Sequence, residues 1–178
     1  MSEQPTPRQW ALRVAVSEID THVATGPWDG PIRVFSLVDT KAALTDDPVF
    51  ARELPEQIRS EAEASPAHFT AVEQEGLPQV DTLEALLAQI SWPPAVAGAV
   101  VVVERIVLPP QAEAELGAQA STAEYLAHPD RDDVRMCCGV LRSEEHWCVL
   151  RLRKSNEVVG GADLVPQLTS ALLATFSP

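Results

Sequence analysis

The sequence is short of basic residues. It has 13 lysines and arginines against 26 aspartates and glutamates, which gives a formal net charge of -13 at pH 7. A strongly negative chain is repelled by nucleic-acid phosphates and by anionic lipid surfaces. Nucleic acid and membrane are therefore not expected as partners. The excess of acid is larger in residues 1–97 than in residues 98–178, so any positive surface is expected in the second half.

Cysteine is scarce, and apolar runs long enough to span a membrane are absent. The three cysteines are an odd number, and Cys137 and Cys138 are adjacent in a predicted strand, where neighbouring side chains point to opposite faces. A disulfide framework is therefore not expected. The N-terminus has no basic segment followed by an apolar run, so we expect a cytoplasmic protein.

Motifs of the common enzyme and cofactor sites are missing. Gly160 and Gly161 are the only adjacent glycines, and they lie outside the strand–loop–helix context of a nucleotide site. There is no Gly-x-Ser-x-Gly sequence, and the spacing of the four histidines fits no short zinc motif. These patterns predict no catalytic residue, no metal site and no cofactor.

Two local arrangements have two interpretations each. His128 and the aspartates that follow it either hold a metal loosely or form a solvated polar turn. His146 precedes Cys148 by two residues, which places both side chains on one face of a strand. Cys148 is then either a nucleophile with His146 as its base or a small buried hydrophobe. Neither arrangement identifies a reaction.

Periodicity and turn residues predict an α+β fold. Residues 39–79, which three prolines interrupt, are predicted to form short helices, and residues 155–161 a turn. The valine run at 100–103 is typical of a central strand that is covered on both faces. Strands are predicted at 32–38, 98–108, 134–142 and 147–154, and helices at 7–26, 81–90, near 121–126 and at 164–173.

These elements predict a four-stranded, largely antiparallel sheet with helices packed mainly on one face. A chain of 178 residues, of which 46% are hydrophobic, can bury the core of one domain. We therefore predict a single domain over residues 1–178, in which residues 1–6 form a flexible N-terminus.

Arginines recur on the predicted strands. Residues two apart on a strand share a face, so Arg151 and Arg153 project from the same side as Trp147 and Val149. If neighbouring strands align their polar faces, the set is joined by Arg33, Arg105 and Arg135. Such a face binds carboxylates or phosphates through bidentate hydrogen bonds. Alternatively, these arginines pair with acids of covering helices or form the solvated side of the sheet.

A series of sequence blocks runs through the chain. It includes TAVEQEGLP at 70–78, VERIVLPP at 103–110, HPDRDDVR at 128–135, LRLR at 150–153 and DLVPQL at 163–168. In this order, over about residues 8–175, the blocks resemble a family of uncharacterised actinobacterial proteins. The resemblance implies no activity, because the family has none assigned. It does imply that Arg105, His128, Arg135, Arg151 and Arg153 belong to motif blocks.

We derive two main hypotheses of function. The first is a non-enzymatic interaction protein, adaptor-like or chaperone-like, that binds an acidic peptide or another protein through the arginine-rich sheet face or an edge strand; the same edge would allow a homodimer. The second is an enzyme or small-ligand binder in which arginines hold an anionic metabolite and His128 or His146 acts as acid or base. The predicted ligand-binding residues are Arg105, Arg135, Arg151, Arg153 and His128.

A third reading is a structural subunit of a larger assembly. The deciding observation is whether the face of Arg151 and Arg153 is open or is covered by the acidic helices of the chain.

Overall fold

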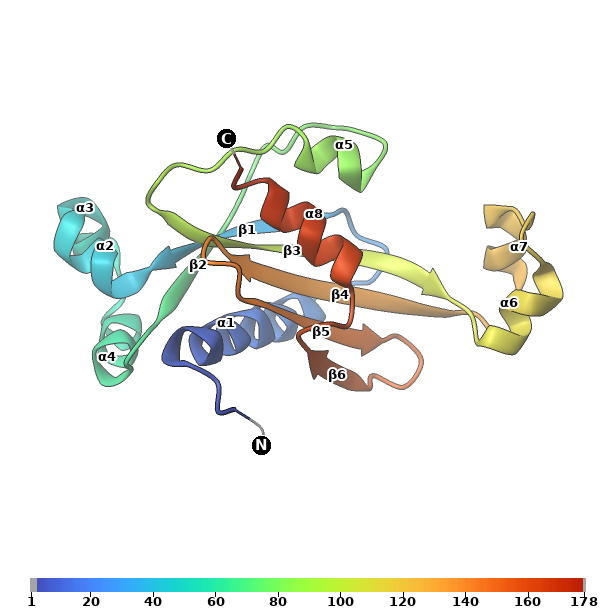
Figure 1. The fold of residues 1–178 in the computed structure, drawn as a ribbon, viewed down its shortest axis with the longest axis horizontal. Helices are drawn as coiled ribbons and strands as arrows, with labels where there is room; N and C mark the ends of the chain where they lie inside the picture. The colour runs from blue at the N-terminus through green and yellow to red at the C-terminus, as the bar shows by residue number, and fades with distance from the viewer. Residues whose placement is uncertain (1–2, 178) are drawn as a thin grey trace.

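One antiparallel sheet runs through the molecule. The computed structural model describes residues 3–177, and these residues form six strands and eight helices (Figure 1). The strands lie in the order β2-β1-β3-β4-β5-β6. Their bounds are β1 Arg33–Asp39, β2 Phe69–Glu73, β3 Val96–Val107, β4 Asp132–Leu141, β5 His146–Leu152 and β6 Val158–Gly161. The α+β class is confirmed, whereas the prediction of four strands is wrong.

The two additional strands, β2 and β6, form the edges of the sheet. β2 falls within the segment predicted as short helices, and β6 falls within the predicted turn. They have five and four residues, and most of these are exposed. A short exposed edge strand needs no apolar run, so its sequence pattern does not differ from that of a loop.

The central part of the sheet is as predicted. β3 pairs with β1 on one side and with β4 on the other, and β4 and β5, at the last two predicted strands, form a hairpin. Val100 and Val102 of β3 pack into one core cluster, and Val101 and Val103 pack into a second cluster on the opposite face. The valine run therefore marks a strand that is covered on both faces.

Helix α1 (Pro7–Ala24) lies within the predicted helix 7–26 and starts at a capping box, in which Thr6 and Gln9 exchange hydrogen bonds. Of the predicted flexible segment 1–6, residues 1 and 2 lie outside the described residues, while Thr6 is held by this cap. The other helices are α2 Thr40–Asp46, α3 Pro48–Glu53, α4 Glu56–Ala64, α5 Leu83–Leu87, α6 Pro110–Leu116, α7 Thr122–Ala127 and α8 Pro166–Ala174.

The helices do not gather on one face of the sheet, so that part of the predicted architecture is wrong. α1 packs across one face, and α5 and α8 cover the opposite face (Figure 1). Neighbouring residues of β4, such as Cys137 and Cys138, are both fully buried although they point to opposite sides. Because the central strands are apolar on both sides, each face requires a covering helix.

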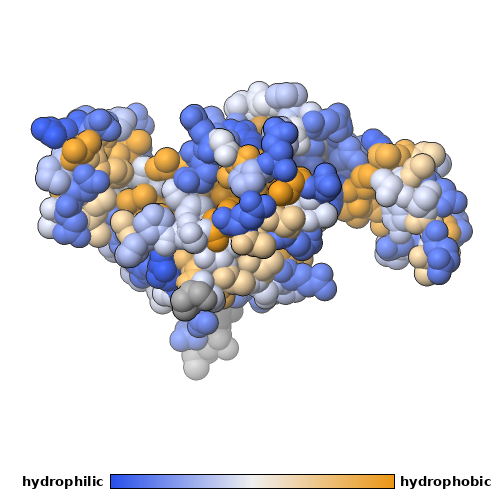
Figure 2. All heavy atoms as spheres, turned by 90° about the horizontal axis from the view of Figure 1, so that it is seen from above, coloured by the Kyte–Doolittle hydropathy of each residue, from blue (hydrophilic) through white to orange (hydrophobic). Residues whose placement is uncertain are grey.

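The remaining helices lie beyond the ends of the strands. α2–α4 and α6–α7 are at opposite ends of the molecule, and α6–α7 form a projecting lobe (Figure 2). Among the helices of residues 3–177, none combines the length and the apolar character that crossing a membrane requires.

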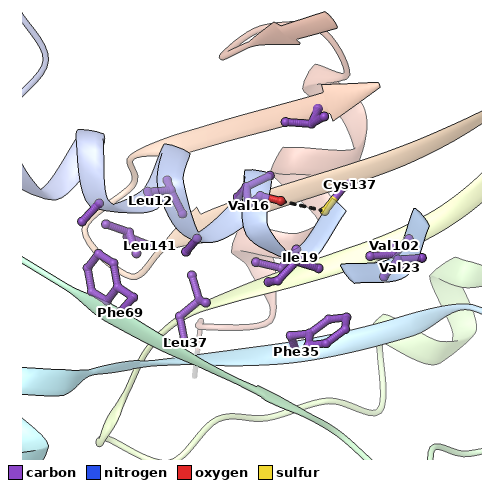
Figure 3. Packing of buried hydrophobic residues seen from close by; sticks show 14 residues of the cluster. Leu12, Val16, Ile19, Val23, Phe35, Leu37, Phe69, Val102, Cys137 and Leu141 are labelled. Carbon is purple, nitrogen blue, oxygen red and sulfur yellow. Dashed lines mark hydrogen bonds between the residues drawn. The ribbon is translucent and has the colours of Figure 1, made fainter. Parts of the chain in front are cut away.

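Helix α1 lies unusually close to β4. Its buried side chains Leu12, Val16, Ile19 and Val23 follow helical spacing and point toward the sheet (Figure 3). Below them is Gly139, where a Cβ atom would lie 2.6 Å from a methyl group of Val16 and 3.2 Å from one of Leu12. A glycine at this position therefore lets the helix approach the strand.

This contact predicts that Gly139→Ala destabilises the fold, because the added methyl group overlaps with Val16. Overpacking of this kind costs about 1–3 kcal/mol. Urea unfolding measures the difference, with Gly30→Ala as the control, since no atom lies within 4 Å of a Cβ at that glycine. Equal unfolding midpoints for the two variants would contradict the close packing of α1.

Candidate functional site

Three of the predicted arginines meet on the α1 face of the sheet. Arg135 of β4 and Arg151 of β5 are direct cross-strand partners, and Arg153 follows Arg151 by two residues. Val149 and Trp147 of the same strand belong to the core cluster below α1. The predicted shared face is therefore present, and we call Arg135, Arg151 and Arg153 the arginine cluster.

Arg151 is bound by an acid of α1. Its Nη2 donates to Oδ2 of Asp20 at 2.7 Å, and its Nε donates to Oδ1 at 3.4 Å, while Nη1 donates to the side-chain oxygen of Asn156 at 2.7 Å. Asp20 is only 2% exposed. Two opposite charges removed from water in this way depend on each other, because either one alone would be buried without a partner.

Arg153 is bound by the loop that follows α1. Nη1 and Nη2 donate to the two carboxylate oxygens of Asp29 at 3.0 and 3.1 Å, and Nη1 also donates to Asp133 at 2.9 Å. The guanidinium carbon lies 5.5 Å from the ring centre of Trp28. Arg153 is the most exposed member of the cluster, with 38% of its side chain accessible.

Arg135 is the most buried arginine, with 1% of its side chain exposed. Its Nη2 donates to Glu104 at 3.1 Å and to the carbonyl of Pro27 at 3.2 Å, and its guanidinium lies 4.3 Å from the ring centre of Trp28. Nε and Nη1 of Arg135 have no hydrogen-bond partner among residues 3–177. Glu104 accepts a further bond from the backbone N–H of Asp29, which ties the loop to the sheet.

The other two predicted ligand residues lie elsewhere. Glu104 is paired with Arg135 across β3 and β4, so the next residue, Arg105, projects from the opposite face, where it borders a hollow beside α8. His128 follows α7, and its Nδ1 accepts a hydrogen bond from the backbone N–H of Asp130 at 3.0 Å. The structure thus brings together three of the five predicted residues.

The arginine cluster is covered by the acids of the chain itself. Asp20, Asp29, Asp133 and Glu104 occupy donors of all three guanidinium groups. An acidic peptide would have to displace these carboxylates before it could bind Arg151 or Arg153. Away from these ion pairs, open surface lies on the other side of the helix as well.

A groove runs along that side of α1, between the helix and β2, and we call it the α1–β2 groove. It consists of three adjacent hollows of about 350, 350 and 610 Å³. The first two share Ala15, Glu18, His68 and Phe69, and the second and third share Glu73. The hollows follow α1 from its first turn to the loop beyond its last turn.

The middle hollow lies between α1, α4, β1 and β2. Its apolar walls include Ile19, Phe35, Ile58 and Phe69, and its polar groups are Glu18, Glu61, Glu73, His22 and His68. Two contacts order this polar set. Nδ1 of His68 is 2.8 Å from the hydroxyl of Thr40, and Glu73 binds Arg33 through two bonds of 2.6 and 2.9 Å.

The carboxylates of the middle hollow differ in their electrostatic environment. Partial burial, and then the negative charge of Glu61, raise the pKa of Glu18 above its ordinary value of 4.5. The hydrogen bonds from Arg33 lower the pKa of Glu73 instead. Glu18 and Glu61 therefore form a negative site without an arginine or lysine partner among residues 3–177.

The outer edge of β2 borders this groove. Gln74 donates to Val34 and Thr40 donates to His68 through backbone groups, so the even-numbered residues of this segment face β1. In an antiparallel pair the intervening residues point their N–H and C=O groups away from the partner strand. Phe69, Ala71 and Glu73 therefore present backbone groups at the edge that have no partner among residues 3–177.

A family model described as PPA1309-like protein matches residues 12–177. The chain belongs to the PPA1309-like family. The match covers most of α1, the whole sheet and α8, and therefore the arginine cluster and most of the groove. No curated protein and no solved structure matches this PPA1309-like chain.

The cysteines of the PPA1309-like chain are buried rather than placed in a cleft. Cys137, Cys138 and Cys148 are each 0% exposed. His146, the base considered for Cys148, is hydrogen-bonded to Asp163 at 3.2 Å. The geometry favours the small buried hydrophobe over the nucleophile, because a thiol that solvent does not reach is inert.

The groove was not predicted from the sequence. One of its walls is β2, and the segment 70–73 (TAVE) is too short and too polar to stand out as a strand. His22 and His68 come from distant parts of the chain, so no local spacing connects them. The one usable signal was the β-branched Thr70 and Val72 between the prolines of this region.

The buried ion pair predicts a large loss of stability for Asp20→Ala, because Arg151 is left buried without its carboxylate. Breaking such a pair costs about 3–5 kcal/mol. Arg153→Ala is the control and should cost much less, since its pair with Asp29 is exposed. Chemical denaturation measures both values, and similar losses for the two variants would contradict the difference in burial.

The environment of Glu18 predicts that Glu18→Gln stabilises the protein at pH 7, by about 1 °C in melting temperature. The pKa of Glu18 is raised on folding, so its ionised form is less favourable in the folded chain than in the unfolded chain. The difference should therefore vanish as the pH falls through the raised pKa toward 4.5. Glu63→Gln, on the exposed side of α4, is the control of equal charge, and an identical pH profile for both variants would refute the assignment.

Proposed function

We propose that the protein is a non-enzymatic interaction protein of the cytoplasm that holds an extended segment of a partner protein in the α1–β2 groove. The observation that carries this proposal is the edge of β2, a strand of five residues that has no partner strand on this side among residues 3–177 and that lies along the α1–β2 groove. α1 has 18 residues and is about 27 Å long. An extended segment of about eight residues has the same length.

The backbone of β2 supplies the general part of such binding. An added strand pairs with the outward N–H and C=O groups of Phe69, Ala71 and Glu73. This pairing does not depend on the sequence of the partner, because it uses backbone groups only. Alternate side chains of the segment then point toward the α1 face, where the hollows receive them. The apolar walls of the middle hollow favour burial of an aliphatic chain.

The arginine cluster has a structural role in this proposal and does not bind the partner. Its guanidinium groups hold α1 and the following loop against the sheet, and α1 is one wall of the groove. The predicted acidic-peptide partner stays a prediction, because its site requires release of Asp20 or Asp29. The predicted homodimer would use the same edge of β2 in two copies, and it is an outcome of the test below.

A second candidate function is the binding of a small anionic or carbonyl-bearing ligand in the third hollow. It is favoured by Arg135, which lines that hollow and has two nitrogens without a hydrogen-bond partner. Glu73, Glu75 and Glu104 also line the hollow, and their carboxylates would repel an anionic ligand. A panel of carboxylates and phosphates that leaves the melting temperature unchanged removes this candidate.

The proposed function predicts binding of a blocked seven-residue peptide of alternating threonine and valine with lysine at its centre. Fluorescence polarisation of the labelled peptide measures the affinity. Ala71→Pro should weaken binding at least about tenfold, which is about 1.4 kcal/mol, because it removes an outward N–H. The variant should fold normally, since proline is tolerated where the N–H lies on the open side of an edge strand.

Ala71→Ser is the matched control, because it keeps the N–H and the small side chain, and it should bind as the unchanged protein does. If the proline and serine variants bind the peptide with equal affinity, the proposal is wrong. The protein could instead form dimers that the peptide does not dissociate and that Ala71→Pro abolishes. This result would show that the edge of β2 serves the homodimer and not a partner peptide.

A further inference from the structure

The middle hollow combines an apolar lining with two carboxylates that no lysine or arginine of residues 3–177 pairs with. Glu73 is neutralised by Arg33, but Glu18 of α1 and Glu61 of α4 have no lysine or arginine partner among residues 3–177. The basic groups of the hollow are His22 and His68, and Nε2 of His68 is 4.0 Å from Glu61. The two carboxylates line the same hollow from different helices.

Repulsion between these carboxylates is part of what raises the pKa of Glu18. A cation placed between them relieves this repulsion and gains two attractive interactions in a partly desolvated site. The side chain of a lysine or arginine also carries an aliphatic stem, which packs on apolar walls while its charged end reaches the polar groups. Phe35, Ile58 and Phe69 supply such walls.

We propose that the partner segment held in the α1–β2 groove inserts a basic side chain into the middle hollow, where Glu18 and Glu61 bind its charge. This inference rests on the proposed function and specifies the chemistry of the partner. The acidic character of the chain favours it as well, because a net charge of -13 attracts basic segments over a longer range.

The test compares three blocked seven-residue peptides of alternating threonine and valine that differ only in the central residue, which is lysine, norleucine or glutamate. Fluorescence polarisation at physiological salt measures each affinity. The lysine peptide should bind about tenfold more tightly than the norleucine peptide, and the glutamate peptide should bind more weakly than both. In the double variant Glu18→Gln, Glu61→Gln the ratio of the lysine affinity to the norleucine affinity should fall to about one.

The matched control is the double variant Glu53→Gln, Glu63→Gln, which removes the same net charge from exposed positions of α3 and α4 outside the groove. It should keep the preference for lysine. A preference that is lost equally in both double variants reflects only the overall charge and overturns the inference. So does a preference that survives the loss of Glu18 and Glu61.

The remaining outcomes separate this inference from the proposed function. If the three peptides bind with equal affinity and Ala71→Pro weakens the binding of all three, the groove binds peptides. The proposed role of a basic side chain in the middle hollow is then refuted. If none of the three binds, the proposed function fails and the inference fails with it. Binding of n-butylamine as tightly as the lysine peptide would overturn the peptide assignment in favour of a small amine.

Discussion

The packing of α1 across the sheet is the contact on which the other features depend. Its apolar stripe covers one side of β4 and β5, where Gly139 allows the close approach. The same helix carries Asp20 into the core beside Arg151. The loop that leaves it brings Trp28 and Asp29 against the other two arginines. Its outer side, which bears Glu18, is a wall of the groove.

The charged groups on the two sides of α1 are therefore arranged in opposite ways. On the side of β5, charges are buried in pairs with direct hydrogen bonds, which is the arrangement that makes burial of an ion tolerable. On the side of β2, Glu18 and Glu61 stay near solvent without such a partner, and the cost appears as the raised pKa of Glu18. The ion pairs on the first side hold α1 against the sheet, whereas the carboxylates on the second side are free to bind a cation.

The elements that were predictable carry their signal in a short stretch of sequence. The capping box of Thr6 and Gln9, the valine run of β3 and the hairpin of β4 and β5 each depend on neighbouring residues. Strand parity also placed Arg151 and Arg153 on the same side of the sheet. β2 and β6 were not recognised, because an exposed edge strand is specified by the strand that it pairs with more than by its own residues.

The sequence by itself determined the α+β class, the central strands and the acidic character of the chain, because these follow from local periodicity, from turn residues and from counting charges. Only the tertiary structure decided that helices cover both faces, that Asp20 and Asp29 neutralise the arginines, and that the open site is acidic. These outcomes depend on pairs more than a hundred residues apart, such as Asp20 with Arg151. Such pairs meet only when α1 is docked, and no spacing along the chain encodes that position.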